Sequence, residues 1–497
     1  MRLNYKVYIV QYIFLLFILC GLYELSEGIQ QCFRSILYNY PFYTITGTFK
    51  NPGPFSLIIA IILPIAWFYT VQIRFFIKQQ CIFYKIITVL SVIYILLSLI
   101  VLPLCMSRTS WIAVIVSCIV VAYLCIDKYR IRGALFSLII IILVSCMMGG
   151  VYGLKKESAD GRFLIWKISL SIVKKNPILG VGRGCFPGVY GNEQEIYFRE
   201  GRGSEYEENI AGAPSYAYNE YLQILVEYGI CGLLAYILFI IYAFYRLIRS
   251  NSKEAVAIMG ALISLLTVSL FSYPFRNFYT CLLSVCILIL AIFTPFMKSA
   301  DGRWHLKGSF IALFLLLVVT FYLCKYFGKF GNTRIAYKQW NLLRPYYNES
   351  KFDIIAKNYD VLYPYLKLDA DFLFEYGQCL SHVREYNASN KILQEGLKYS
   401  ADPMFLSIIG KNSQCLGLFQ EAEKMFYKAY FRIPHKIYPL YLLMNLYERE
   451  GRITEMLAIL DLIINKKEKV NSVETKFIKD KALEKSKKYR TDYYKIQ

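Results

Sequence analysis

Long runs of apolar residues constrain this chain more than any other feature of its sequence. About nine are present, near 7–23, 54–73, 82–105, 110–126, 132–153, 217–245, 255–272, 278–297 and 308–326. A bilayer core of about 30 Å requires about 20 mostly apolar residues per helix, so each run predicts a transmembrane helix. Since 57% of all residues are hydrophobic and only 18% are charged, we expect an all-α, polytopic membrane domain over residues 1–326.

The basic residues of the short connections are distributed unequally, and this sets the expected orientation. They gather on one side of the predicted bundle, around positions 2–6, 74–78, 128–132, 246–253 and 298–307. Cytoplasmic loops carry the excess of Lys and Arg, so the N-terminus is expected in the cytoplasm. About nine crossings then place the connection 154–215 and the chain beyond 327 outside. These loops and a Lys-rich tail account for much of the net charge of +21, which therefore does not indicate a nucleic-acid partner.

The sequence pattern changes after about residue 327, where apolar runs give way to amphipathic helical periodicity. Similar stretches recur at 372–403, at 404–436 and from 437 onward, and 333–370 is a candidate first unit. Units of this length bury an apolar face only by stacking on their neighbours. The period resembles that of tetratricopeptide repeats and favours, over an ordinary helical bundle, an α-solenoid at 327–497. Such repeats imply a binding or assembly surface and carry no chemistry of their own.

The connection 154–215 carries an unusual amount of pattern for a loop between membrane helices. Residues 162–175 predict an amphipathic helix at the membrane surface, anchored by Trp166. Arg162 lies at the expected start of this helix, where a cation meets the unfavourable end of the dipole, and this favours a role in anion binding. Gly180-Val181-Gly182-Arg183-Gly184 predicts a turn that either holds a phosphate with Arg183 or only packs on the membrane domain. We expect the acidic stretch 193–208 to be a solvated loop.

Polar residues continue from this loop into the next apolar run. Positions 220, 223 and 227 share one helical face, and they hold Glu220, Gln223 and Glu227, with Asn219 just before them. A polar stripe at a membrane entrance is costly and is typical of a functional site. A water-exposed helix end is the alternative for the first two residues of the segment, whereas Glu227 lies deeper.

Two further arginines, Arg108 and Arg276, stand alone at helix junctions on the expected outer side. Each is either an interfacial anchor or a ligand of an anion. Together with Arg162 and Arg183, they are candidates to converge on one anionic group.

In this order, the motifs resemble the O-antigen ligase and polymerase superfamily of bacterial polytopic membrane glycosyltransferases. The matching elements are Gly47-Thr48-Phe49-Lys50-Asn51-Pro52, Ser107-Arg108-Thr109, Arg162 with Trp166, Asn176-Pro177-Ile178-Leu179-Gly180-Val181-Gly182, and Asn219-Glu220-Tyr221-Leu222-Gln223 followed by Glu227-Tyr228-Gly229. The resemblance covers about 45–297 and implies a GT-C-like membrane enzyme whose site includes the long periplasmic loop. Some relatives also carry tetratricopeptide-like repeats.

The resemblance implies transfer of a glycan from an undecaprenyl-diphosphate carrier at the periplasmic face of the bacterial inner membrane, with membrane lipids around the site. Lipid A–core is the first expected acceptor, and no metal or other cofactor is implied. A polysaccharide polymerase and a protein O-oligosaccharyltransferase remain open within the same class. A transporter of lipid-linked glycan and an inactive assembly scaffold are the alternatives from other classes.

The residue patterns and the resemblance together lead us to expect roles for individual residues. The catalytic candidates are Arg162, Glu220, Glu227 and Tyr218, and the substrate-binding candidates are Arg108, Arg183, Arg276, Asn219, Gln223 and Asn51. Where the family often has a His just before the Asn of the last motif, this chain has Tyr218. A tyrosine, with an ordinary pKa of about 10, is a poor base at neutral pH, so Glu220 or Glu227 is expected to replace the His. The chain also has fewer predicted helices than many relatives, which suggests a shortened N-terminus.

Overall fold

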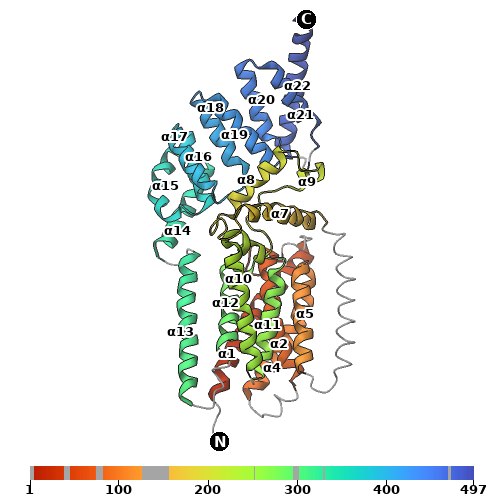
Figure 1. Cartoon of the computed structure of the whole chain (residues 1–497), viewed down its shortest axis with the longest axis vertical. Coiled ribbons are helices and arrows are strands. Elements are labelled where there is room, and N and C mark those ends of the chain that lie inside the picture. The colour runs from red at the N-terminus through yellow and green to blue at the C-terminus, as the bar shows by residue number, and fades with distance from the viewer. Residues whose placement is uncertain are drawn as a thin grey trace. The chain divides into compact units, whose positions relative to one another are not determined.

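The computed structural model describes residues 5–38, 45–73, 82–125, 156–250, 252–294, 302–327, 331–467, 469 and 472–496 (Figure 1). Every regular element within these ranges is a helix, which confirms the all-α prediction. The chain divides into two compact units. The first comprises Met1–Lys156, Tyr218–Tyr221 and Leu233–Phe327, and the second comprises Glu157–Ala217, Leu222–Gly232 and Gly328–Gln497. The long loop is therefore counted with the C-terminal helices.

The first unit is a bundle of apolar helices. It contains α1 (Tyr5–Tyr38), α2 (Pro52–Val71), α4 (Ile82–Leu104), α5 (Arg108–Cys125), most of α10 (Glu220–Arg249), α11 (Glu254–Ser269), the 3-10 turn η2 (Pro274–Arg276), α12 (Phe278–Phe293) and α13 (Gly302–Tyr326). In the described part of the chain, five helices are long and apolar enough to cross a membrane: Val10–Tyr38, α2, α4, α5 and α10. Shorter apolar helices are α11, α12 and Phe314–Lys325. These cover every predicted run except 132–153, which lies outside the described residues, and they make the chain a multi-pass membrane protein.

The first helix is longer than the sequence predicted. The prediction ended it at residue 23 and made 24–53 a loop, whereas α1 continues to Tyr38. Two polar residues of the longer helix bind the turn that precedes α2. Gln31 Oε1 accepts the backbone N–H groups of residues 46 and 47 at 2.7 and 2.9 Å, and Glu24 Oε1 accepts the hydroxyl of Thr48 at 2.6 Å. A polar side chain that is hydrogen-bonded inside the protein does not need to reach solvent, so the helix can continue past it.

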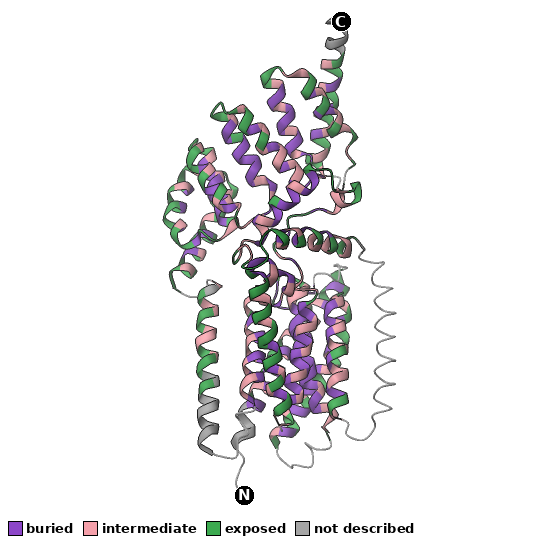
Figure 2. Cartoon of the chain, viewed as in Figure 1, coloured by how far each residue is buried: buried purple, intermediate pink, exposed green. Residues whose placement is uncertain are grey.

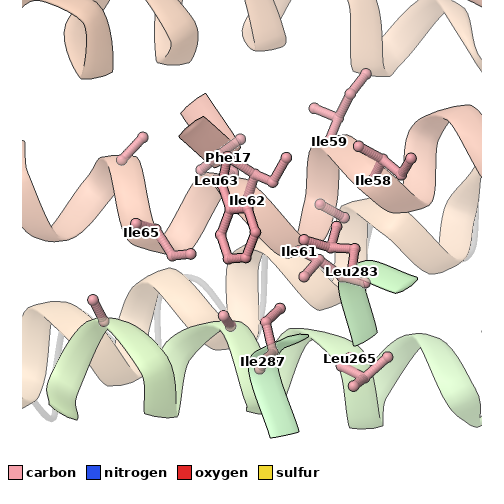
Figure 3. Close-up of a cluster of buried hydrophobic side chains, with 14 of the residues drawn as sticks. Phe17, Ile58, Ile59, Ile61, Ile62, Leu63, Ile65, Leu265, Leu283 and Ile287 are labelled. Carbon is pink, nitrogen blue, oxygen red and sulfur yellow. The ribbon is translucent and has the colours of Figure 1, made fainter. Parts of the chain in front are cut away.

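The core of the first unit is built around α2, most of whose residues are buried, as Figures 2 and 3 show. Pro64 lies inside this helix and has no N–H group to donate to the carbonyl of Ala60. The hydroxyl of Ser264, from α11, donates to that carbonyl at 2.7 Å. At the preceding residue, the Tyr94 hydroxyl donates to the Ile59 carbonyl at 3.1 Å. Polar side chains of neighbouring helices thus hydrogen-bond the backbone around the proline in an apolar interior.

The second unit combines the long loop with the C-terminal helices. Its loop helices are α7 (Lys156–Lys175), α8 (Phe186–Arg199) and α9 (Glu205–Ile210). The C-terminal helices are α14 (Gly331–Asn348), α15 (Phe352–Leu366), α16 (Ala370–His382), α17 (Tyr386–Gly396), α18 (Pro403–Cys415), α19 (Phe419–Arg432), α20 (Tyr438–Glu450), α21 (Ile453–Asn465) and α22 (Val473–Ile496). Successive C-terminal helices pack on one another, and α8 packs on α19.

The C-terminal helices form pairs that follow the predicted repeat period. α16 and α17 lie in or near the stretch 372–403, α18 and α19 lie in or near 404–436, and α20 and α21 occupy the stretch from 437. Within each of the first two pairs, a glycine on one helix allows the other to approach. A Cβ at Gly377 would lie 2.5 Å from Leu393, and one at Gly410 would lie 2.4 Å from Phe426. Their assignment as tetratricopeptide repeats stays a prediction.

Candidate functional site

Helix α10, which follows the long loop, is kinked at Gly229, and the loop supplies hydrogen-bond partners for the backbone at the kink. At φ 66° and ψ −166°, this glycine breaks the helical path of α10. Four hydrogen bonds then join the helix to the loop segment 177–182. The N–H groups of Ile230 and Cys231 donate to the carbonyls of residues 177 and 178, at 2.8 and 3.4 Å, and the N–H groups of Val181 and Gly182 donate to those of residues 226 and 227, at 2.9 and 3.0 Å. The kink breaks two helical hydrogen bonds, and the loop supplies a new partner for each donor and each acceptor that they leave unpaired.

Two glycines make this close pairing possible. A Cβ on Gly229 would lie 2.1 Å from the carbonyl oxygen of Ile178, and a Cβ on Gly180 would lie 2.5 Å from the carbonyl carbon of Glu227. Both glycines also have positive φ, of 66° and 70°, which L side chains rarely adopt. Backbone atoms cannot move away as a flexible side chain can, so neither position accommodates a larger residue.

This pairing decides between the two interpretations of the glycine-rich motif at 180–184. The N–H groups of Val181 and Gly182 are occupied by carbonyls of α10, so they are not free to form a phosphate-binding turn. The packing interpretation therefore holds for this part of the motif, although its partner is the kinked stretch of α10. Arg183 follows directly and is exposed. An isolated glycine within the apolar run at 229 was the sequence signal for the kink.

A chain of hydrogen bonds links the predicted polar stripe to the loop helix. Gln223 donates from Nε2 to Glu227 Oε1 at 2.7 Å, and its Oε1 accepts the N–H of Ala217 at 2.7 Å. The carbonyl of Ala217 in turn accepts the indole N–H of Trp166 at 2.8 Å. Gln223 and Glu227 are almost fully buried, with 2% and 1% of their surfaces exposed. The sequence predicted that these two side chains share a face, and the structure confirms it and brings Trp166 to them.

The loop helix α7 differs from its prediction in two respects. It begins by Lys156, not at residue 162, so Arg162 lies well inside the helix and the argument from the unfavourable end of the dipole was wrong. The apolar face was expected at the membrane surface. Instead, Leu164, Ile168 and Ile172 are buried in a protein core with residues of α8 and α10.

In the first unit, Glu220 is placed against the turn that carries Arg276. Its Oε1 accepts the backbone N–H of Phe275 at 3.2 Å, and only 3% of Glu220 is exposed. The carbonyl of Pro274, in the same turn, accepts the Thr280 hydroxyl at 2.6 Å. A carboxylate in the first turn of α10 also lies at the favourable end of that helix dipole. The candidate acid–base group of α10 thus contacts the short turn η2, which carries one candidate arginine.

Tyr218, at the position where the family often has a His, has a backbone conformation that the sequence did not predict. Its φ is 53°, in the left-handed region that is an outlier for a bulky residue. Such strain costs on the order of 1–3 kcal/mol and persists only where surrounding contacts hold it. The ring of Tyr218 makes an edge contact with that of Tyr273, at 5.5 Å between centroids, so the segment 218–221 is fixed on both sides of Asn219.

The remaining candidates of the first unit lie at helix starts. Arg108 is the first residue of α5, two positions before Ser110, whose hydroxyl donates to Ser56 Oγ at 2.9 Å. Asn51 caps α2, because its Oδ1 accepts the N–H of Gly53 at 2.8 Å. A structural role thus accounts for Asn51. Of the four candidate arginines, Arg108 and Arg276 belong to the first unit, whereas Arg162 and Arg183 belong to the second.

The acidic stretch 193–208 is not the solvated loop that was expected. Much of it is helical, and Glu193 and Glu195 on α8 are each only 6% exposed. Glu193 pairs with Lys175 of α7 at 2.5 Å, and Glu208 pairs with Lys466 at 2.5 Å. The basic and acidic parts of the loop form ion pairs with each other and with the C-terminal helices. The paired residues are far apart in the sequence, so their spacing could not predict these contacts.

One of these ion pairs gives a prediction on pH. Lys167 donates to Glu207 Oε1 at 2.8 Å, while the N–H of Ser204 and the hydroxyl of Tyr197 donate to Glu207 Oε2. Burial raises the pKa of Glu207, but these hydrogen bonds outweigh it and the pKa lies below its ordinary 4.5. The stabilisation is therefore present above about pH 4.5 and is lost as the pH falls through the folded-state pKa.

We accordingly expect the amides of residues 204–210 to exchange hydrogen faster at low pH, after correction for the intrinsic rate. Hydrogen exchange of the purified chain at pH 6 and pH 3.5 measures this. In the Glu207→Gln variant the corrected difference should shrink. An equal difference in wild type and variant would contradict the prediction.

Comparison with known proteins adds one finding. A family model described as O-antigen ligase matches residues 93–237, from within α4 to within α10. The match includes Arg108, Arg162, Arg183 and the segment 218–227, whereas Asn51 and Arg276 lie outside it. No curated protein matches the sequence. The match supports the O-antigen ligase and polymerase superfamily, an enzymatic family of glycosyl transfer, for the membrane part of the chain.

Proposed function

We propose, from the O-antigen ligase match over residues 93–237, that this protein transfers a glycan from an undecaprenyl-diphosphate carrier to an acceptor hydroxyl. The reaction takes place at the periplasmic face of the inner membrane, and lipid A–core is the first candidate acceptor. The observation that carries the proposal is that one family match spans the Arg108 motif, the long loop and the polar start of α10, in the order in which the sequence presents them. The C-terminal helices are proposed to lie in the periplasm and to bind the acceptor or a protein partner.

The proposed reaction is a single displacement. The acceptor hydroxyl attacks the anomeric carbon, the bond from that carbon to the diphosphate oxygen breaks, and undecaprenyl diphosphate leaves. The hydroxyl proton passes to a carboxylate that acts as general base. Negative charge grows on the diphosphate as it leaves, and guanidinium groups stabilise this charge through bidentate hydrogen bonds. All atoms and electrons are accounted for without a redox step.

We assign the general base to Glu220 and charge stabilisation to Arg276, with Arg108 in support. The hydrogen bond from Phe275 to Glu220 supports this pairing, because it holds the carboxylate on the turn that carries the arginine. We assign Arg162 and Arg183 to donor recognition. Glu227 remains the second candidate base, and Tyr218 and Asn219 are assigned to acceptor positioning.

Gln223 is assigned a positioning role through its hydrogen bond with Ala217. Asn51 is assigned a positioning role because it caps α2. Within the same class, a polymerase and a protein O-oligosaccharyltransferase share this chemistry and differ in the acceptor.

Glycan profiling tests the proposed function. A deletion strain is complemented with wild type, with Arg162→Ala, or with the empty vector, at matched protein levels. Accumulation of full-length glycan on the undecaprenyl carrier in the deletion strain identifies a ligase, and single-repeat glycans identify a polymerase. Arg162→Ala is not expected to restore the wild-type glycan profile. An unchanged profile in the deletion strain would contradict glycan transfer, and full rescue by Arg162→Ala would favour a scaffold.

A lysine on the same helix provides the matched control. Lys174 lies in the last turn of α7 and is exposed, so Lys174→Ala removes a positive charge from α7 without touching the assigned residues. This variant should restore the wild-type glycan profile. Loss of function in both variants would indicate that α7 contributes only its general charge.

A further inference from the structure

The second unit contains a cavity of about 410 Å³ that the proposed reaction does not use. It lies among the loop segment 181–195 and the helices α17, α18 and α19. One wall is aliphatic and includes Leu397, Leu406, Ile409 and Met425. The volume falls within the range of about 300–1,000 Å³ that is common for small-molecule sites.

A buried arginine forms part of the polar wall. Only 2% of Arg432 is exposed. Its Nη2 donates to Asn192 Oδ1 at 2.5 Å, and its Nη1 donates to the carbonyl of Ser400 at 3.4 Å. Its Nε has no hydrogen-bonding partner among the residues that the structure describes. A guanidinium group carries five N–H donors, and leaving one unsatisfied in a buried position costs stability.

The charges around the cavity are not balanced. Lys398 and Lys428 line it together with Arg432, whereas Glu195 is the one carboxylate among its lining residues. Glu195 is already paired with Arg199, at 2.8 Å. Of the three cations only Arg432 is buried, and it interacts with the carboxylates of Glu195 and Asp402, whereas Lys398 is exposed and Lys428 is half-buried. The lining still carries more cations than carboxylates, and the Nε of Arg432 lacks an acceptor among the described residues, so an anion from outside the chain would supply both a charge partner and an acceptor.

We propose that this cavity binds an anionic sugar residue, one that bears a carboxylate or a phosphate. Arg432, Lys398 and Lys428 take the anionic group. The amides of Asn192 and Gln394, which also line the cavity, bond sugar hydroxyls, and the aliphatic wall packs against the C–H groups of the ring. The choice of a saccharide rests on the proposed glycan transfer, whereas the choice of an anion rests on the charges alone.

The position of the cavity in the fold links it to the loop. Val181, whose N–H donates to α10, also lines the cavity, and so does Cys185. Gly188 packs so closely on the carbonyl oxygen of Leu397 that a Cβ would lie 2.3 Å from it. A sugar bound here therefore contacts both the loop and the C-terminal helices, and would fix one against the other.

Calorimetric titration of the purified full chain in detergent tests this proposal. The probes are glucuronic acid, glucose 6-phosphate, inorganic phosphate and glucose. We expect at least one of the two anionic sugars to bind, and glucose to bind at least tenfold more weakly. Binding of glucuronic acid identifies a carboxylate as the recognised group, and binding of glucose 6-phosphate identifies a phosphate.

Variants of the two lysines locate the site without disturbing the buried arginine. Lys398→Gln with Lys428→Gln should weaken binding of the anionic sugar at least tenfold, because each loses a charge-assisted hydrogen bond. Lys391→Gln with Lys424→Gln removes two exposed charges from α17 and α19 outside the cavity lining, and should leave binding unchanged.

Three results would overturn the proposal: glucose binding as tightly as the anionic sugars, inorganic phosphate binding as tightly as glucose 6-phosphate, or no effect of the cavity lysines. The titration does not require glycan transfer. A chain that binds the anionic sugar but leaves the cellular glycan profile unchanged on deletion would retain this site and lose the proposed function.

Discussion

Replacement of Glu220 by Gln is expected to lower the rate of glycan transfer by about 10²–10⁴-fold, the usual contribution of a general base. The amide keeps an oxygen that accepts the N–H of Phe275, as the carboxylate does at 3.2 Å, so the turn that carries Arg276 should keep its position. Only the ability to take up a proton is removed. Single-turnover transfer with a lipid-linked glycan and the purified variant measures this rate.

Glu254 provides a matched control for this experiment. It also lies in the first turn of a membrane helix, α11, and its carboxylate accepts a hydrogen bond from the amide of Gln11 at 3.1 Å. Glu254→Gln should therefore transfer glycan at the wild-type rate. If Glu220→Gln is fully active while Glu227→Gln is not, the proton acceptor is Glu227. Full activity of both Glu220→Gln and Glu227→Gln would exclude a carboxylate base on α10.

The second large effect is expected from Gly229. Valine at this position would place a Cβ 2.1 Å from the carbonyl oxygen of Ile178 and would require a backbone conformation that is almost restricted to glycine. The strain and the loss of the four hydrogen bonds to the loop together correspond to a destabilisation on the order of 4 kcal/mol. We expect Gly229→Val to lower the thermal unfolding temperature strongly, and to increase hydrogen exchange at Val181 and Gly182.

Gly161 offers the contrasting substitution. It lies in α7, and a Cβ there would meet nothing within 4 Å. Gly161→Ala should leave stability unchanged or raise it by about 0.5–1 kcal/mol, since alanine favours helix. Equal unfolding temperatures for Gly229→Val and wild type would show that the loop does not depend on the kink of α10.

Much of the fold could be predicted because its signals are local. Apolar runs of membrane length indicated helices that the structure confirms wherever it describes them, and the repeat period after residue 327 anticipated the helix pairs. The prediction ended the first helix with the apolar run at residue 23, and it missed the extension to Tyr38, where Glu24 and Gln31 hydrogen-bond the turn at 46–48.

The candidate site was predicted less completely than the fold. The shared face of Gln223 and Glu227 followed from helical spacing and is confirmed by their hydrogen bond. The contact of Glu220 with the turn at 274–276 joins residues about 55 positions apart, and no spacing rule reaches across that distance. The roles of the four arginines stay predictions.

The sequence by itself determined that this chain is an all-α membrane protein with a long patterned loop and helical pairs after it, because hydropathy and periodicity act over a few turns of one helix. The tertiary structure decided which contacts individual residues of these patterns make. It showed that Gly180 and Gly229 bring two backbones together, that Asn51 caps a helix, and that Arg432 is buried beside a cavity. These properties arise only when segments distant along the chain pack together, since burial and hydrogen bonding depend on every neighbour in space.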